Sequence, residues 1–170
     1  VIIYEQIKEQ KSIGNCYNNI GLGYLYQINY KKAEEYYEKS LKVREEIGDK
    51  KGISDVCYGL GVALGYQGEY DKALINYKRA IQLKSEIGDK KGWADCCGNM
   101  GVIYHNKSDY SESLKCYKTA LKMQEELIDS AGIANTLSNI GNTYGRKSDY
   151  DTALVYYSKA LQVNEKKKNK

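Results

Sequence analysis

The sequence predicts an all-α fold, a solenoid of antiparallel helical hairpins stacked one after another. The string EIGDKKG at Glu46–Gly52 recurs letter for letter at Glu86–Gly92, forty residues later. Within each forty-residue unit, apolar residues recur every three or four positions, as they do on amphipathic helices. The chain also contains no proline, so it lacks the strongest helix breaker.

The forty-residue offset divides the chain into four whole units at residues 11–50, 51–90, 91–130 and 131–170. Three columns are invariant: Gly21, Gly61, Gly101 and Gly141; Tyr30, Tyr70, Tyr110 and Tyr150; and Tyr37, Tyr77, Tyr117 and Tyr157. Residues 1–10 align with residues 41–50, the end of the first forty-residue unit, so we interpret them as the end of a preceding repeat. The sequence therefore suggests a fragment of a longer array, ending in a basic tail at Lys166–Lys170.

Each unit is predicted to form two helices, called helix A and helix B, which in the second unit span about Lys51–Gln67 and Tyr70–Ile87. Gly48 and Gly88 suit the position just past a helix end. Asp49, Asp89 and Asp129 suit the N-cap of the next helix A. Gln67-Gly68-Glu69 supplies the turn inside the second hairpin.

The invariant glycine column lies in the middle of helix A, where glycine costs up to about 1 kcal/mol relative to alanine. Its recurrence indicates that two helices approach closely there, and we expect the small residues Ala73 and Ala80 of helix B to lie opposite Gly61. Because these glycines are helical, the Gly-x-Gly pairs do not form a nucleotide-binding turn.

Composition excludes several classes of function. The net charge of +4 comes from 26 basic and 22 acidic residues interspersed along the chain, which predicts no nucleic-acid partner. No apolar run is long enough for a membrane span. The five cysteines, Cys16, Cys57, Cys96, Cys97 and Cys116, are an odd number without a C-x-x-C pair. We interpret them as reduced, core-filling thiols of a cytoplasmic protein.

The columns resemble the tetratricopeptide repeat (TPR), whose order is a large residue, Leu-Gly, Tyr, Ala, an aromatic residue and Ala. The fourth unit shows Leu137, Ile140-Gly141, Tyr144, Ala153, Tyr157 and Ala160. The forty-residue period and the missing proline are similar to the long repeats of Pins/LGN adaptors, kinesin light chains, and bacterial Rap-type receptors and sensor kinases. The resemblance implies a right-handed superhelix, lined on its concave face by the A helices, that binds an extended or helical peptide.

Mapping the groove positions of that family onto this chain gives the candidate peptide-binding residues: Asn15, Asn18, Asn19, Asp55, Tyr58, Asp95, Asn99, His105, Asn135, Asn139, Asn142 and Arg146. Asparagine both donates and accepts hydrogen bonds, so it can pair with a ligand backbone whatever its sequence. The alternative is that Asn19, Asn99 and Asn139 bond the neighbouring helix. No register supplies the two cations of a carboxylate clamp, and Asp55 and Asp95 favour a neutral or basic peptide.

We therefore predict a non-catalytic scaffold for a protein or peptide ligand, without cofactor or metal. The single histidine, His105, does not recur between units, so no metal cluster forms. One alternative is a regulatory sensor array within a larger signalling enzyme, such as a histidine kinase or cyclase. Another is weak self-association through exposed end repeats.

Overall fold

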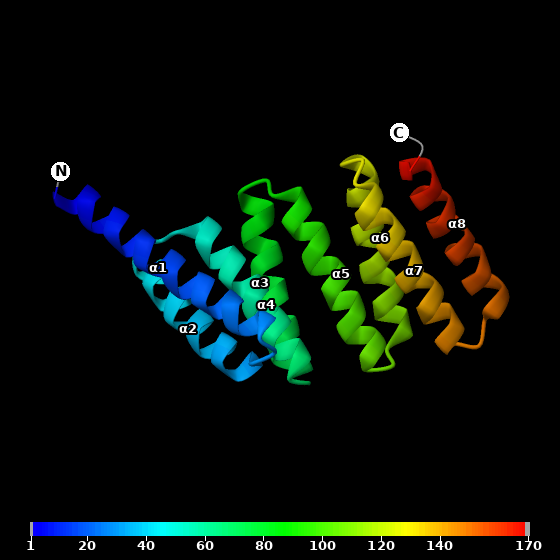
Figure 1. The fold of residues 1–170 in the computed structure, drawn as a ribbon, viewed down its shortest axis with the longest axis horizontal. Helices are drawn as coiled ribbons and strands as arrows, with labels where there is room; N and C mark the ends of the chain where they lie inside the picture. The colour runs from blue at the N-terminus through cyan, green and yellow to red at the C-terminus, as the bar shows by residue number, and fades with distance from the viewer. Residues whose placement is uncertain (1, 169–170) are drawn as a thin grey trace. The chain divides into compact units, whose positions relative to one another are not determined.

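A computed structural model of the chain describes residues 2–168, which form eight α-helices (Figure 1). The helices form adjacent antiparallel pairs, α1 with α2, α3 with α4, α5 with α6 and α7 with α8, so the all-α hairpin architecture is confirmed. The helices are α1 (Ile2–Tyr26), α2 (Tyr30–Glu46), α3 (Lys50–Tyr66), α4 (Tyr70–Glu86), α5 (Lys90–Asn106), α6 (Tyr110–Glu126), α7 (Ser130–Arg146) and α8 (Tyr150–Lys168).

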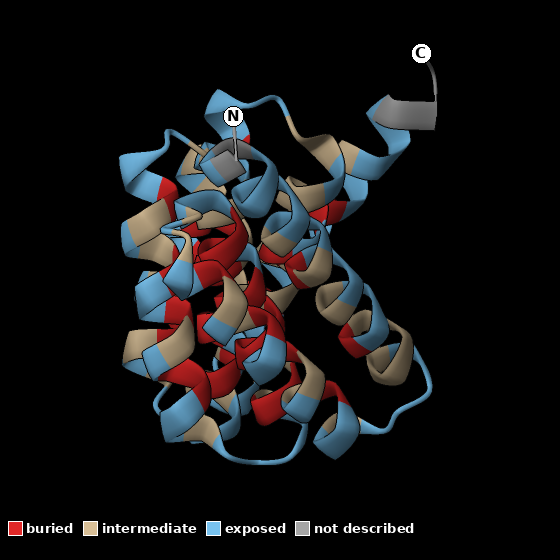
Figure 2. Ribbon diagram, turned by 90° about the vertical axis from the view of Figure 1, so that its left-hand side faces the viewer, coloured by how far each residue is buried: buried red, intermediate tan, exposed pale blue. Residues whose placement is uncertain are grey.

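The chain forms two compact units, each containing two hairpins. The N-terminal unit, Val1–Asp89, contains α1 to α4, and the C-terminal unit, Lys90–Lys170, contains α5 to α8. Buried residues follow the sides on which paired helices face one another, while the outward sides are exposed (Figure 2). Each unit therefore has its own core between helices.

Helix α1 differs from the other A helices because it is 25 residues long and continues through the position of the expected turn. The residues at that position are Lys8 and Glu9, where the second unit has Gly48 and Asp49. Without a glycine to adopt positive φ and an aspartate to cap a new helix, the backbone stays helical. The assignment of residues 1–10 to a preceding repeat stays a prediction.

The turns between hairpins follow the predicted chemistry. Gly48 and Gly88 have φ of 65° and 73°, as the left-handed position after a helix end requires. The Asp49 and Asp129 carboxylates accept hydrogen bonds from the backbone N–H of Gly52 and Gly132, so both act as N-caps as predicted. The turn chemistry therefore fixes where α3 and α7 begin.

Among the turns between hairpins, the one at Ile128 carries backbone strain, and Ile28, inside the first hairpin, has a similar φ of 61°. Ile128 occupies the position of Gly48 and Gly88 with φ of 55°, a conformation that a β-branched residue reaches only at a cost. Its side chain is 81% exposed, so little packing compensates for this strain.

Replacing Ile128 by glycine is expected to raise the free energy of unfolding by about 1 kcal/mol, because glycine adopts this backbone without steric cost. Urea unfolding followed by circular dichroism measures the change. The matched control is Leu127→Gly at the preceding residue, whose φ is −87°. A control that gained as much stability would show that strain is not the cause.

The invariant glycine and tyrosine columns pack against each other. A Cβ atom at Gly61 would lie 2.6 Å from the ring of Tyr77, and one at Gly101 would lie 2.5 Å from the ring of Tyr117. The atoms nearest such a Cβ at Gly61 thus belong to Tyr77, one helical turn from Ala73 and Ala80, and the placing of these two alanines opposite Gly61 stays a prediction. The glycine makes room for a large aromatic ring, which fills the space between helices that two small residues would leave open.

The cysteines divide by depth. Cys57, Cys96 and Cys97 are buried, which confirms their role as core residues. Burial raises the pKa of Cys57 to about 11 and that of Cys97 to about 12, so both stay protonated at neutral pH. Cys16 is exposed, and for this residue the core prediction is wrong.

Candidate functional site

Two polar stripes run along α5 and α7 of the C-terminal unit. On α7 the spacing of three or four residues places the whole stripe on one face of the helix, whereas on α5 Asp95 and Asn99 share a face and His105 lies six residues further along. Asp95, Asn99 and His105 are half-buried on α5, and the stripe of α7 consists of Asn135, Asn139, Asn142 and Arg146. Since His105 of α5 contacts Thr143 of α7, the two stripes lie on neighbouring helices.

A hollow of about 560 Å³ opens between these helices and α8. It brings together three predicted site residues, His105, Asn142 and Arg146, with a largely apolar wall. The wall is formed by Gly145, Tyr150, Ala153, Leu154 and Tyr157. The hollow therefore combines a few polar groups with an apolar surface, which is typical of a ligand site.

The polar groups of the hollow are held in place by short contacts. His105 Nδ1 lies 3.0 Å from Thr143 Oγ1, and the Thr143 hydroxyl donates to the Asn139 carbonyl at 2.9 Å. The threonine oxygen therefore accepts from Nδ1–H, which leaves Nε2 of His105 as an acceptor. The Tyr157 hydroxyl donates to Asn142 Oδ1 at 2.7 Å.

The electrostatics favour a neutral histidine beside a cation. Burial and the nearby guanidinium of Arg146 both lower the pKa of His105 below its usual 6.5. Arg146 itself is exposed and forms no salt bridge with a carboxylate in the described part of the chain. The hollow therefore offers one fixed positive charge to a ligand.

The other predicted site residues, Asn15, Asn18, Asn19, Asp55 and Tyr58, belong to the N-terminal unit. Asn15 and Asn19 are exposed, and Asn18 is half-buried. The ring of Tyr58 lies edge-on to that of Tyr77, with centroids 6.0 Å apart.

Asn15 is bound by a buried cation of its own hairpin. Arg44 is only 5% exposed, and its guanidinium donates to Asn15 Oδ1 at 2.6 Å and to Asp49 Oδ2 at 2.5 Å. Its Nε donates to Ser40 Oγ at 3.2 Å, and the Ser40 hydroxyl donates to the Gly14 carbonyl. Asn15 thus helps to join α1 to the end of α2.

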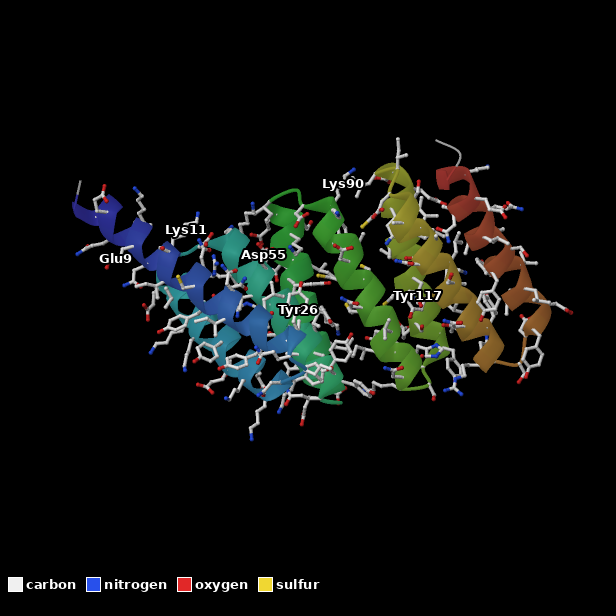
Figure 3. The ribbon with its side chains drawn as sticks, in the orientation of Figure 1. Glu9, Lys11, Tyr26, Asp55, Lys90 and Tyr117 are labelled. Atoms are coloured by element: carbon white, nitrogen blue, oxygen red, sulfur yellow. The ribbon has the colours of Figure 1, made fainter. Side chains whose placement is uncertain are left out.

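Lys84 plays the same part in the second hairpin. Its ammonium lies 2.8 Å from Asp55 and 2.9 Å from Asp89, with the side chain 5% exposed (Asp55 is labelled in Figure 3). Burial alone would lower the pKa of Lys84, but hydrogen bonds and charges from the two carboxylates outweigh it and raise the pKa. The ammonium is therefore charged at neutral pH, and its contribution to stability is lost only as the pH rises through that raised pKa.

These contacts change the charge that the sequence predicted for the peptide-binding surface. The expectation of a neutral or basic ligand rested on Asp55 and Asp95, and Lys84 compensates the charge of Asp55. In the hollow, the fixed charge is instead the positive one of Arg146.

Sequence reasoning missed two groups of residues. The first is the buried polar position at the end of helix B, Arg44, Lys84 and Gln124. Its signal was a polar residue five positions before the capping Asp49, Asp89 and Asp129. The second is the apolar wall contributed by α8, whose signal was the apolar spacing of Tyr150, Leu154 and Tyr157 along this helix.

Metal-ligand clusters and membrane-spanning helices are both absent from residues 2–168. No group of three or more histidine, cysteine or acidic side chains is placed to hold a metal ion. Among the helices of this region, none combines the length and hydropathy needed to cross a bilayer.

A sequence profile of the tetratricopeptide repeat matches residues 12–86 and 94–166. The chain belongs to the tetratricopeptide repeat family. TPR domains are usually non-catalytic modules that bind proteins or peptides. A comparison with curated protein sequences gave no significant match.

Several solved structures share the fold of this chain at low sequence identity. BtubC (BKLC) from P. vanneervenii is 20% identical with a TM-score of 0.85, and the apo form of RapI is 18% identical with a TM-score of 0.82. Aspartyl phosphate phosphatase F from Bacillus subtilis is 14% identical with a TM-score of 0.87. Each alignment covers 92% of this TPR chain but only 65%, 44% and 41% of the respective relative.

Proposed function

We propose that this chain is a non-catalytic TPR module that binds a segment of a partner protein along the polar stripes of α5 and α7. The observation that carries the proposal is the hollow beside those stripes, in which Arg146, His105 and Asn142 stand next to an apolar wall. Such a site suits a segment that is held by its backbone and anchored by one side chain.

Each polar group has a defined role in the proposal. The amides of Asn99 and Asn139 pair with backbone N–H and C=O groups of the ligand. The guanidinium of Arg146 binds one carboxylate, and Nε2 of His105 accepts one hydrogen bond. Leu154 and Tyr157 contact the apolar part of the same ligand side chain. A single guanidinium does not make a clamp for two carboxylates.

The proposal is tested by screening a peptide array with the 170-residue chain and then measuring dissociation constants of the selected peptides by calorimetry. Arg146→Gln is expected to weaken binding about tenfold or more, because a hydrogen bond to a charged group contributes about 1.5–3 kcal/mol. The double variant Asn99→Ala, Asn139→Ala is expected to weaken it by a similar factor.

The matched control is Glu125→Ala, which removes an exposed charge from α6 away from the hollow. This variant should bind with unchanged affinity. Full binding by the double asparagine variant would move the ligand off the stripes of α5 and α7 and overturn the proposal.

A further inference from the structure

A second hollow, of about 520 Å³, opens within the C-terminal unit between the N-terminal end of α5 and the C-terminal half of α6. Its apolar floor contains Trp93 of α5 and Met123 of α6, and both side chains are half-buried. Charged side chains form its rim: Lys90, Lys118, Lys122 and Glu126. The two hollows have no lining residue in common, so this one is a separate surface of the same unit.

Two of the four charges on the rim compensate each other. The ammonium of Lys90 lies 3.1 Å from the carboxylate of Glu126 (Lys90 is labelled in Figure 3). The equivalent pair of the second hairpin, Lys50 and Glu86, lies 2.8 Å apart. The contact therefore recurs between the ends of paired helices and adds no net charge to the hollow.

The other two charges are both positive and have no partner. Lys118 and Lys122 are exposed and lie four residues apart, so they share one face of α6 at a separation of about 6 Å along the helix axis. Neither ammonium forms a salt bridge with any carboxylate in the part of the chain that the structure describes. An acidic ligand can therefore pair with both lysines without displacing an existing contact.

The apolar floor is particular to this hairpin. Trp93 stands where the second hairpin has Ile53, which is only 7% exposed. Arg79 of α4 extends to α2 and donates to a glutamate there at 2.6 Å. Its counterpart on α6 is the much shorter Thr119, whose hydroxyl donates to a carbonyl of its own helix at 3.0 Å. No long side chain extends from this position of α6, so part of the Trp93 side chain stays accessible.

We infer that this hollow, here called the Trp93 site (Trp93, Met123, Lys118 and Lys122), binds an acidic amphipathic helix of a partner protein. An apolar side chain of that helix enters between Trp93 and Met123. Two carboxylates on the same helix, one turn apart, pair with the two lysines. Tryptophan suits the role of anchor, because it buries a large apolar area and is enriched among the residues that contribute most to binding.

The spacing of the charges favours a helical ligand over an extended one. On a helix, side chains at positions i, i+3 and i+4 lie on one face, so an apolar side chain and two carboxylates can all point at the Trp93 site. On an extended strand, the side chain between two residues of one face points to the opposite side. The inference does not depend on the proposed binding along α5 and α7.

Fluorescence measures binding at this site directly, because Trp93 is the single tryptophan of the chain. The probe is a peptide of three Glu-Ala-Ala-Leu repeats with blocked ends, which places glutamate and leucine on one helical face. Adding it to the 170-residue chain is expected to shift the emission of Trp93 to shorter wavelength, since the indole loses contact with water. Added salt should weaken the binding, because the paired charges are exposed.

Variants of the chain test both parts of the Trp93 site, with affinities measured by calorimetry. The double variant Lys118→Glu, Lys122→Glu is expected to weaken binding about tenfold or more, because like charges then face each other. Trp93→Ile introduces the residue that the second hairpin has at this position, and it should weaken binding by about tenfold. Circular dichroism spectra equal to the parent's establish that the variants are folded.

The matched control is Lys31→Glu, Lys42→Glu, which makes the same change of net charge at exposed positions of α2. Its affinity should stay within about twofold of the parent's, because long-range effects of exposed charges are screened.

Three results would overturn the inference. The first is a tryptophan emission that the peptide leaves unchanged. The second is equal affinity for the same peptide with glutamine in place of each glutamate, which would show that charge does not select the ligand. The third is displacement of the peptide by an equal concentration of a short oligothymidylate, which would show that the lysines bind polyanions, nucleic acid included, rather than an acidic helix.

Discussion

Replacing Arg44 by methionine is expected to lower the free energy of unfolding by about 3 kcal/mol. Methionine is similar in length but removes the charge, so Asp49, Asn15 and Ser40 all lose their bonds to the guanidinium. The Asp49 side chain is only 10% exposed, and breaking a buried pair by removing one partner costs about 3–5 kcal/mol. Asp49 still accepts from Gly52 N–H, which places the expected loss at the lower end.

Urea unfolding measures this loss, and two further variants separate its causes. Lys39→Ala removes an exposed cation from the same helix and should leave the midpoint unchanged, because its pair with Glu35 is solvated. The double variant Arg44→Met, Asp49→Asn should cost less than the sum of the two single changes, since it leaves no buried charge unpaired. Strict additivity would refute the coupling between Arg44 and Asp49.

Replacing Gly101 by alanine is expected to lower the free energy of unfolding by about 1–2 kcal/mol, although alanine is the better helix former. The added methyl group would lie 2.5 Å from Cε1 of Tyr117, a ring that is held against Ile140 in the core. Overpacking a filled core costs about 1–3 kcal/mol, which exceeds the gain in helix propensity of up to about 1 kcal/mol.

Gly98, one turn earlier on the same helix, provides the control. A Cβ atom there has no neighbour within 4 Å, so Gly98→Ala is expected to stabilise the chain by up to about 1 kcal/mol. The two substitutions are chemically identical and should shift the urea midpoint in opposite directions. A stabilising Gly101→Ala would show that the glycine column does not exist to accommodate the tyrosine ring.

Much of the fold follows from residues that act on the backbone locally, at turns and helix ends. The hairpin boundaries depend on Gly48, Asp49 and their repeats, because positive φ and side-chain capping act over three or four residues. The absence of those residues at Lys8 and Glu9 equally explains why α1 continues. The residue types of the core columns were also predictable, because equivalent positions of each forty-residue unit pack against the same kinds of neighbour within the hairpin.

The candidate site was only partly predictable. Spacing alone placed Asn142 and Arg146 on one face of α7, because helical periodicity determines which residues share a face. Spacing could not show that Asn15 and Asp55 would be bonded by Arg44 and Lys84, which lie 29 residues further along the chain. Such contacts depend on how closely two helices approach.

By itself, the sequence determined the number of repeats, the helix type, the turn positions and the TPR family, because each depends on local spacing. Only the tertiary structure decided which ring lies against Gly61, which carboxylates are already paired and which apolar faces stay uncovered. Those properties arise where separate helices meet. The distance between the helices decides which polar side chains pair and which apolar side chains are buried. The four-fold repeat makes the hairpins alike, whereas their neighbours in space make Ile20 differ from Ile140 and Leu154 from Leu114.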